Sequence, residues 1–484
     1  MTLAEKKPIM NPLPFGTADF LCESVCAMKK KYEINMTDGP LLRKMISFAF
    51  PLMLSGMLQL LFNAVDVIVV GKFVGDTALA AVGSTGALVN LIIGLFMGLS
   101  VGTNVLCAQG FGSGREKDVQ ETVHTSVLIS LVFGVVLGIF GFIFARVFLE
   151  WMSSPADVID QATIYLKIYF LGMPVIMLYN FASAALRAIG DTKRPMYYLL
   201  AAGVVNLVMN LFFVLVVKIG VAGVAIATVM SQALSAGLVV RCLMKEESMV
   251  HLDLRKLRIH GNKLKSIIRI GLPAGIQGIV FSISNVLIQS SINSFMSSAI
   301  AGNTAASNLE SFTGTAMNAF YQTNLNVVSQ NVGAKKYDRI WRCMFLCIVM
   351  VSITGFVMGM GFYTFGNFFL RFYTDNEEVV RYGLIRLSIC SRFHLLAGLM
   401  DCIVGGLRGL GSSILPMIVS LTGACVFRII WISTIFQQNH TLETLYASYP
   451  ISWALTAAVH LLCFIVIFRR VKAKNAEKER LRAY

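Results

Sequence analysis

Apolar stretches of about 20 residues recur along the chain, separated by short polar segments, and each is long enough to cross a ~30 Å hydrocarbon core as an α-helix. They are far longer than the strands of a membrane barrel. The pattern predicts an all-α polytopic membrane protein with twelve transmembrane helices. The predicted spans are 46–70, 78–107, 123–145, 162–185, 197–217, 220–243, 267–295, 299–328, 341–369, 382–406, 413–436 and 449–468.

The charged residues fall unequally on the two sides of these spans. The chain has 41 Lys and Arg against 26 Asp and Glu, a formal net charge of +15, and nearly all the Lys and Arg share a side with the two termini. The opposite loops hold acids such as Asp157 and Glu377 and few cations, Arg386 among them. Cytoplasmic loops are enriched in Lys and Arg. We therefore expect both termini on the cytoplasmic side of the cell (inner) membrane.

The chain also repeats itself. AALRAIGDTKRP at 184–195 returns as GGLRGLGSSILP at 405–416, and AQGFGSGREKD at 108–118 returns as SQNVGAKKYDR at 329–339. The matched residues are Arg187 with Arg408, Gly190 with Gly411, Pro195 with Pro416, Gln109 with Gln330 and Gly112 with Gly333, with Pro51 and Gly56 matching Pro273 and Gly278 in the same order. This duplication predicts two parallel six-helix repeats around a central cleft, related by a pseudo-two-fold axis along the membrane normal.

The repeats divide the chain into segments of different expected character. The segments are a cytoplasmic lead-in at 1–40, a first six-helix bundle at 41–244, a basic cytoplasmic linker at 245–266, a second six-helix bundle at 267–470 and a basic cytoplasmic tail at 471–484.

A polar stripe marks the first predicted helix. Ser55, Gln59, Asn63 and Asp66 follow at spacings of 4, 4 and 3, so their side chains share one face of the helix. A carboxylate at the centre of a membrane helix costs about 2.5 to 3.5 kcal/mol, so Asp66 is our leading functional residue. The alternative is a structural aspartate that accepts a hydrogen bond from a neighbouring helix.

The second half has ionisable groups of its own. Glu310 lies on a polar face of span 299–328, His394 and Asp401 share a face of span 382–406, and Arg428 lies within span 413–436. Because an unpaired buried charge is costly, we expect Arg428 to neutralise Asp401 or Glu310 and to leave the other carboxylate free. The pattern does not choose between the two acids, and a purely structural ion pair is an equal alternative.

The segment LFNAVDVIVVGKFVGDTALAAVG at 61–83 resembles the first-helix signature of the multidrug and toxic compound extrusion (MATE) transporters. The resemblance continues through the duplicated Pro, Gln–Gly and LRxxG motifs and covers essentially the whole chain after residue 40. It implies two six-helix bundles around a cleft and cation-coupled antiport. Family members expel bulky, lipophilic, mostly cationic compounds in exchange for protons or sodium.

The resemblance also implies a coupling site. Asp66 matches the helix 1 aspartate of the family, and Asn206 and Asn210 match a pair that in archaeal relatives is Asn followed by Asp, so a second carboxylate is missing here. One branch carries a helix 7 glutamate where this chain has Phe281 and Ser282. The expected coupling residues are Gln59, Asn63, Asp66, Asn206 and Asn210, with a proton or a sodium ion bound at Asp66.

Candidate substrate contacts are aromatic, Met or amide residues in the helices nearest the expected cleft. Flexible thioethers and aromatic rings suit varied flat hydrophobic compounds, although most such residues in a membrane protein are ordinary packing residues. The candidates are Phe62, Gln277, Phe281, Met317 and Tyr321.

Other classes of function find little support in the sequence. No P-loop lysine follows the glycines of 91–102, so we expect no use of ATP, and the basic loops are explained by membrane topology without nucleic acid. We find no grouped nucleophile, base and orienting residue, and expect neither an enzyme nor a cofactor. The expected partners are small molecules and lipid, with the chain as a monomer. The alternative function is a lipid-linked saccharide flippase of the same broad superfamily.

Overall fold

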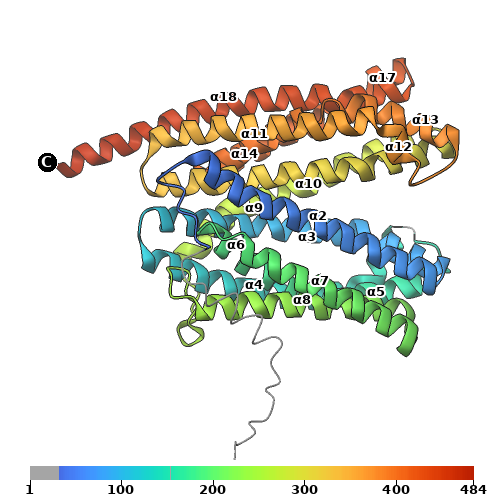
Figure 1. Cartoon of the computed structure of the whole chain (residues 1–484), viewed down its shortest axis with the longest axis horizontal. Helices are drawn as coiled ribbons and strands as arrows, with labels where there is room; N and C mark the ends of the chain where they lie inside the picture. Colours follow the sequence, from blue (N-terminus) through green and yellow to red (C-terminus); the bar gives the residue numbers. More distant parts are fainter. Residues whose placement is uncertain (1–31, 153, 484) are drawn as a thin grey trace, which may run out of the picture.

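The computed structural model describes residues 32–152 and 154–483 (Figure 1). In the first half the chain forms a series of long helices with one π-helical segment, η1, and a short 3-10 turn, η2, in the linker. These elements are α2 (Leu41–Phe73), α3 (Asp76–Gly112), α4 (Glu116–Trp151), α5 (Ile159–Leu171), α6 (Met173–Ala188), α7 (Lys193–Leu211), η1 (Phe212–Val217), α8 (Gly220–Lys245) and η2 (Leu254–Lys256).

The second half follows the same plan, with two further π-helical segments, η3 and η4. Its elements are α9 (Gly261–Ile292), α10 (Ser297–Gly333), α11 (Tyr337–Thr364), α12 (Gly366–Leu370), α13 (Glu377–Arg386), η3 (Leu387–Ser391), α14 (His394–Gly409), α15 (Ile414–Ser420), η4 (Leu421–Val426), α16 (Phe427–Ser433), α17 (Ile435–Gln438) and α18 (Leu442–Ala483).

The predicted all-α fold with twelve spans is confirmed. Among the described residues, nine helical segments are long and apolar enough to cross a membrane, and the bent pairs α5–α6 (47°) and α13–α14 (43°) provide two more spans. The twelfth is α10, a helix of 37 residues that is less apolar because buried asparagine, glutamine and hydroxyl side chains follow its length. These groups hydrogen-bond within the protein, as buried polar groups in a membrane helix must. For example, Asn324 Nδ2 donates to the Cys402 carbonyl over 2.7 Å.

The duplication is visible in the backbone. The turns after α6 and α14 each place a glycine in the left-handed region, Gly190 at φ +92° and Gly411 at φ +88°. The turns after α3 and α10 also contain a left-handed residue, Gly114 at φ +68° and Lys335 at φ +57°. Because a left-handed residue at the C-terminal end of a helix reverses the chain, both halves leave these four helices in the same way.

The two halves form two layers, and α2 runs between them (Figure 1). The start of α2 packs on the second half, where Met45 and Phe48 join a buried cluster with Phe320 of α10 and Cys347 of α11. Its other end packs on α7 of the first half. The helix therefore touches both halves, and any motion of one layer against the other acts on it.

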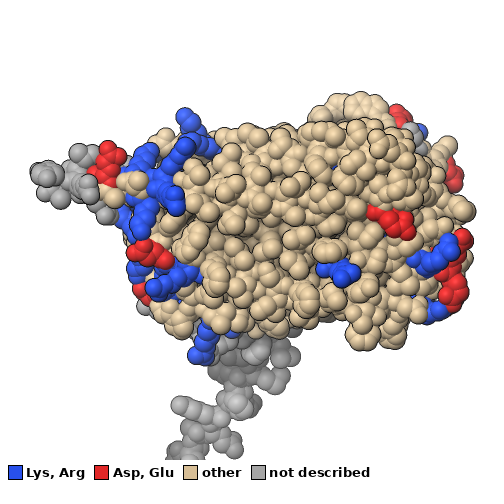
Figure 2. All heavy atoms as spheres, turned by 90° about the horizontal axis from the view of Figure 1, so that it is seen from above, with Lys and Arg blue, Asp and Glu red and all other residues tan. Residues whose placement is uncertain are grey.

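We call the end of the molecule where α2, α4, α9 and α11 begin and α18 ends the basic end. Lys and Arg gather there around the projecting C-terminal helix, and the broad band between the two ends carries few charged side chains (Figure 2). This band is the surface that lipid would cover.

The terminal and linker segments differ from a simple division into bundles and loops. Of the predicted lead-in, residues 1–31 lie outside the described residues, and residues 32–40 pack against the body of the protein. The linker folds back on α4, where Nε2 of His124 accepts a hydrogen bond from the Asp253 amide over 3.1 Å. The predicted tail does not begin as a separate segment, because α18 continues through it to Ala483.

Candidate functional site

Close packing of α2 against α7 positions the first candidate site. Gly203 of α7 faces Phe62 of α2, and a Cβ atom at residue 203 would lie only 2.0 Å from the Phe62 ring. The absence of a side chain at Gly203 thus lets the two helices approach closely.

The approach brings three predicted residues together. Nδ2 of Asn210 donates to Oδ1 of Asp66 over 2.5 Å and to Oδ1 of Asn206 over 3.2 Å. Asp66 is half-buried, whereas Asn206 and Asn210 are buried on α7. The predicted grouping of the helix 1 aspartate with the helix 5 asparagines is therefore present in the fold, and the role of the group in coupling remains a prediction.

The amide oxygen of Asn210 is a further hydrogen-bond acceptor in this site. Oδ1 of Asn210 is buried and has no hydrogen-bond partner among the described residues. This oxygen can accept a hydrogen bond from the Asp66 carboxyl when that group is protonated. Together with the ionised Asp66 carboxylate it can instead supply oxygen ligands to a sodium ion. Gln59 and Asn63, the other residues predicted for this site, lie at exposed positions of α2.

In the second half, Glu310 of α10 has a different partner from the predicted one. Arg386 of α13 donates from Nη2 over 2.7 Å and from Nε over 3.0 Å to Oε2 of Glu310, and from Nη1 over 2.5 Å to Oδ1 of Asn303. Oγ of Ser391 donates to the other carboxylate oxygen over 3.2 Å. The assignment of Arg386 to an outer loop was wrong, because α13 continues through η3 towards α14 and carries Arg386 into the interior.

The predicted pairing of Arg428 with Asp401 or Glu310 was wrong for both acids. Nε of Arg428 donates to Oγ of Ser452 over 3.0 Å, and its guanidinium group lies 4.3 Å from the centre of the Tyr449 ring. The ring face and a hydroxyl thus take the place of a carboxylate. Of the other two predicted residues, His394 packs beside Trp453 and Asp401 is half-buried on α14.

A buried polar chain around Gln277 joins five helices, α9, α10, α14, α15 and α18. Arg408 donates from Nη2 to Oε1 of Gln277 over 2.7 Å and from Nη1 to the Tyr321 hydroxyl over 2.5 Å. Nε2 of Gln277 donates to Oγ of Ser420 over 3.0 Å, and Ser420 also contacts His460. The sequence marked Arg408 only as part of a repeated motif, and its contact with two candidate substrate residues could not be found without the fold.

The remaining candidate substrate residues lie in two environments. Phe281 and Gln277 line a small pocket between α9 and the α15–η4 segment. Met317 is buried, and its side chain fills the space beside Gly355 and Gly398. Substrate binding by these residues stays a prediction.

The duplicated motifs meet at the basic end. Cβ atoms at Gly112 and Gly333 would lie 1.9 and 2.0 Å from the carbonyl oxygens of Gln330 and Gln109, respectively, so the two Gln–Gly pairs cross in a reciprocal contact. Nε2 of Gln109 donates to the Gly409 carbonyl over 3.1 Å, and Nε2 of Gln330 donates to the Ala188 carbonyl over 2.8 Å. The hydrogen bonds described between the two halves gather at this end, which is closed.

Comparison with known proteins agrees with this architecture. The sequence model of the MatE family matches residues 51–212 and 273–432, about two thirds of the chain. The same family pattern therefore occurs once in each half. The probable multidrug resistance protein YpnP of Bacillus subtilis (strain 168) is 26% identical over 395 residues, covering 81% of this chain and 88% of the relative.

Two further comparisons extend the match. The multidrug export protein MepA of Staphylococcus aureus (strain MSSA476) is 20% identical over 441 residues, covering 90% of this chain and 94% of the relative. The outward-facing structure of a MATE family multidrug resistance transporter of the MOP superfamily superimposes with a TM-score of 0.85 at 21% identity, covering 92% of this chain and 99% of that one. Members of this family are transport proteins. The chain is a multi-pass membrane protein that belongs to the MATE family.

Proposed function

We propose that this protein is a secondary active exporter that expels bulky lipophilic, mostly cationic compounds in exchange for protons or sodium ions. The names of its relatives, a probable multidrug resistance protein and a multidrug export protein, support the export of drugs. They favour drug export over the flipping of lipid-linked saccharides. The observation that carries the proposal is the Asp66 carboxylate held by Asn210 between α2 and α7.

The orientation follows from the charges. The basic end faces the cytoplasm of the cell (inner) membrane, because Lys and Arg are retained on that side. With its halves in contact at the basic end, the protein is closed towards the cytoplasm. Alternating access then requires the contacts between Gln109, Gln330 and the opposite half to break, so that the basic end opens.

The coupling ion acts on the contact between Asp66 and Asn210. The ionised carboxylate accepts a hydrogen bond from the Asn210 amide, whereas a protonated carboxyl would donate one. Rotation of the amide would then present the unpartnered Oδ1 of Asn210 to the new hydroxyl. A sodium ion would instead bind the carboxylate and the same Oδ1. Either ion changes how α2 is held against α7, and it neutralises the charge that attracts a cationic substrate.

The energy available sets a limit on the export. One elementary charge moving inward across 100 mV releases about 2.3 kcal/mol. This supports a roughly fiftyfold gradient of a neutral solute if coupling is tight. In a one-for-one exchange with a cationic compound the membrane potential cancels, so the concentration gradient of the ion must drive export.

The test compares Asp66→Asn with Asp157→Asn, an exposed acid in the loop between α4 and α5. Purified protein in liposomes is given a proton gradient or a sodium gradient, and the movement of a fluorescent lipophilic cation is followed. We expect one gradient to drive transport by the parent and by Asp157→Asn, and Asp66→Asn to bind the dye but to lose at least nine tenths of the driven transport.

Either of two results would contradict the proposal. If Asp66→Asn transports as well as the parent, Asp66 is not the coupling residue. If the parent moves no cation under either gradient, the proposed substrate class or coupling is wrong.

A further inference from the structure

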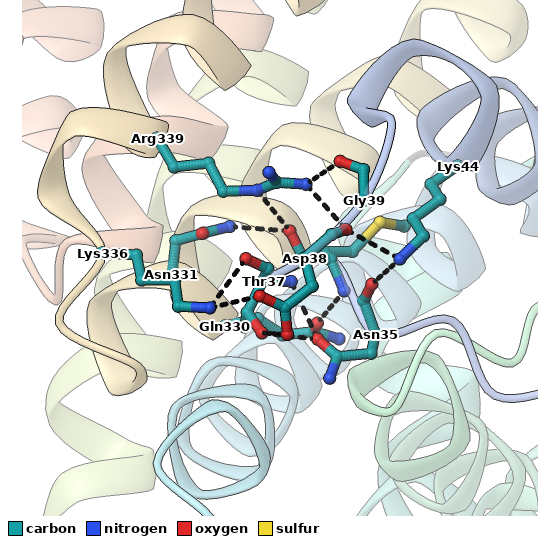
Figure 3. Close-up of polar contacts among 10 residues, drawn as sticks. Asn35, Thr37, Asp38, Gly39, Lys44, Gln330, Asn331, Lys336 and Arg339 are labelled. Carbon is teal, nitrogen blue, oxygen red and sulfur yellow. Dashed lines mark hydrogen bonds and ion pairs between the residues drawn. The ribbon is translucent and has the colours of Figure 1, made fainter.

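We propose that residues 32–39, which we call the inner strap, form a latch that holds the basic end closed and must leave the first half before that end can open. The inference rests on the proposed alternating access and adds a segment outside both repeats to it. The strap precedes α2 and lies across the junction of the two halves (Figure 3).

The strap is firmly bound to the second half. The amide of Met36 donates to Oε1 of Gln330 over 2.8 Å. Arg339 of α11 donates to three strap carbonyls, from Nε to Met36 over 3.0 Å and from Nη2 to Asp38 over 2.8 Å and Gly39 over 2.6 Å. Lys336 forms an ion pair with Asp38, and the Met36 side chain is fully buried in the cluster of α2, α10 and α11 (Figure 3).

The strap also lies very close to the turn between α6 and α7 of the first half. The amide of Ile34 donates to the Ile189 carbonyl over 3.1 Å. A Cβ atom at Gly190 would lie 2.5 Å from the carbonyl oxygen of Ile34 and 2.8 Å from its Cα, so the strap backbone rests directly on the glycine. The guanidinium group of Arg194 also lies 5.8 Å from the centre of the Tyr32 ring.

The two attachments are too near each other to allow the halves to part. Only Asn35 separates Ile34, bound to the first half, from Met36, bound to the second, and two residues of extended chain reach at most about 7 Å. When Ala188 separates from Gln330, one attachment must break. Because several hydrogen bonds and the buried Met36 side chain hold the strap to the second half, we expect the attachment at Ile34 to break first.

The strap responds to the position of the halves rather than to pH. The strap carries Asp38, and the ionisable groups that contact the strap include Lys44, Arg194, Lys336 and Arg339. The hydrogen bond from Lys336 lowers the pKa of Asp38 below its ordinary value, so this carboxylate stays ionised throughout the neutral range and the ion pair is lost only in strong acid.

The repeat supplies a matched control for the test. Gly190 and Gly411 occupy equivalent turns with nearly equal φ angles, so alanine strains the backbone equally at both. Only Gly190 touches the strap, since a Cβ atom at Gly411 would meet nothing within 4 Å. A difference between Gly190→Ala and Gly411→Ala therefore reports the strap contact.

The experiment measures opening of the basic end without substrate or ion gradient. The ten native cysteines are replaced, and one cysteine is placed at Val105, which is buried between the halves beside Leu325 and Val404. In inside-out vesicles we follow its reaction with a membrane-impermeant maleimide. Gly190→Ala should react at least tenfold faster than the parent, and Gly411→Ala within twofold of it.

A second variant distinguishes loss of the strap contact from a distortion of the turn at Gly190. Ile34→Pro removes the amide donor from the strap and leaves Gly190 unchanged, and it should also accelerate the reaction. Equal rates for Gly190→Ala and Gly411→Ala, or no acceleration by Ile34→Pro, would overturn the latch. Because no transport is measured, failure of the export proposal leaves this result readable.

Discussion

The residues that carry charge inside this protein are held in two different ways. Asp66 accepts a hydrogen bond from a neutral amide and has no cationic partner among the described residues, whereas Glu310 is bound on both sides of its carboxylate by Arg386 and Ser391. A carboxylate tied to an arginine cannot easily exchange its partner. This difference supports the proposed coupling role of Asp66, and we predict a structural role for Glu310.

The structural role predicts a large loss of stability when the pair is broken. Removing one partner of a buried ion pair leaves an uncompensated charge and costs about 3 to 5 kcal/mol. We expect Glu310→Gln and Arg386→Gln each to lower the free energy of unfolding by this amount, measured by denaturation in detergent, and the double variant Glu310→Met/Arg386→Met to recover most of it.

The control for this prediction is the exposed ion pair between Arg371 and Glu377, at 2.6 Å. Exposed pairs contribute about 1 kcal/mol or less, so Arg371→Gln should change stability little. A Glu310→Gln variant as stable as Arg371→Gln would show that the buried pair is not structural.

At the scale of elements, the contact between α2 and α7 decides whether Asp66 and Asn210 can meet. Both residues could be placed on their helices from the sequence, but the distance between the helices depends on Gly203, which no pattern along the chain marks. The same holds for α10, where the side-chain amides of Asn324 and Asn326 find backbone acceptors on α14 and α6.

A side chain at Gly203 should separate α2 from α7. We expect Gly203→Val to reduce ion-driven transport at least tenfold, because its methyl groups would occupy the position of the Phe62 ring. Transport of a fluorescent cation in liposomes measures the effect. Gly237→Val, at an exposed glycine of α8 with nothing within 4 Å, is the matched control and should transport normally.

A compensating variant tests the steric explanation. Phe62→Leu combined with Gly203→Val should restore part of the lost transport, since the smaller side chain makes room. If the double variant is as impaired as Gly203→Val alone, the loss has a cause other than helix separation.

At the scale of the whole molecule, the two halves share a backbone plan but not their chemistry. The repeat places Ile288 opposite Asp66 and Val89 opposite Glu310, and both counterparts are apolar. The Gln–Gly pairs, in contrast, are kept in both halves and meet each other at the closed end. The two Gln–Gly pairs contact each other reciprocally, so both halves need the same residues there. The charged residues make no such reciprocal contact, and they differ between the halves.

The orientation of the whole molecule has a direct test. Asp157→Cys lies at an exposed position of the end opposite the basic end, and Lys256→Cys lies in the exposed linker. In intact cells an impermeant maleimide should label Asp157→Cys at once and Lys256→Cys only after permeabilisation. The reverse pattern would place the basic end outside and contradict the proposed direction of transport.

The sequence alone was enough to predict the number of spans, the duplication, the family and the candidate residues Asp66, Asn206 and Asn210, although not the contact between them. These follow from hydrophobic length, from repeated motifs and from residue type, which are local properties of the chain. It failed for Arg386, assigned to a loop although it lies inside, and for Arg428, whose partners are Tyr449 and Ser452.

Which charges meet, and what joins the two halves, became clear only in the three-dimensional fold. The partner of a buried charge depends on how helices distant in sequence rotate and bend, as α13 does through η3, and no spacing along the chain encodes that rotation. The strap is the clearest case. Residues 32–39 have no pattern of their own, and they gain a role because Ile189 of one half and Gln330 of the other lie beside them.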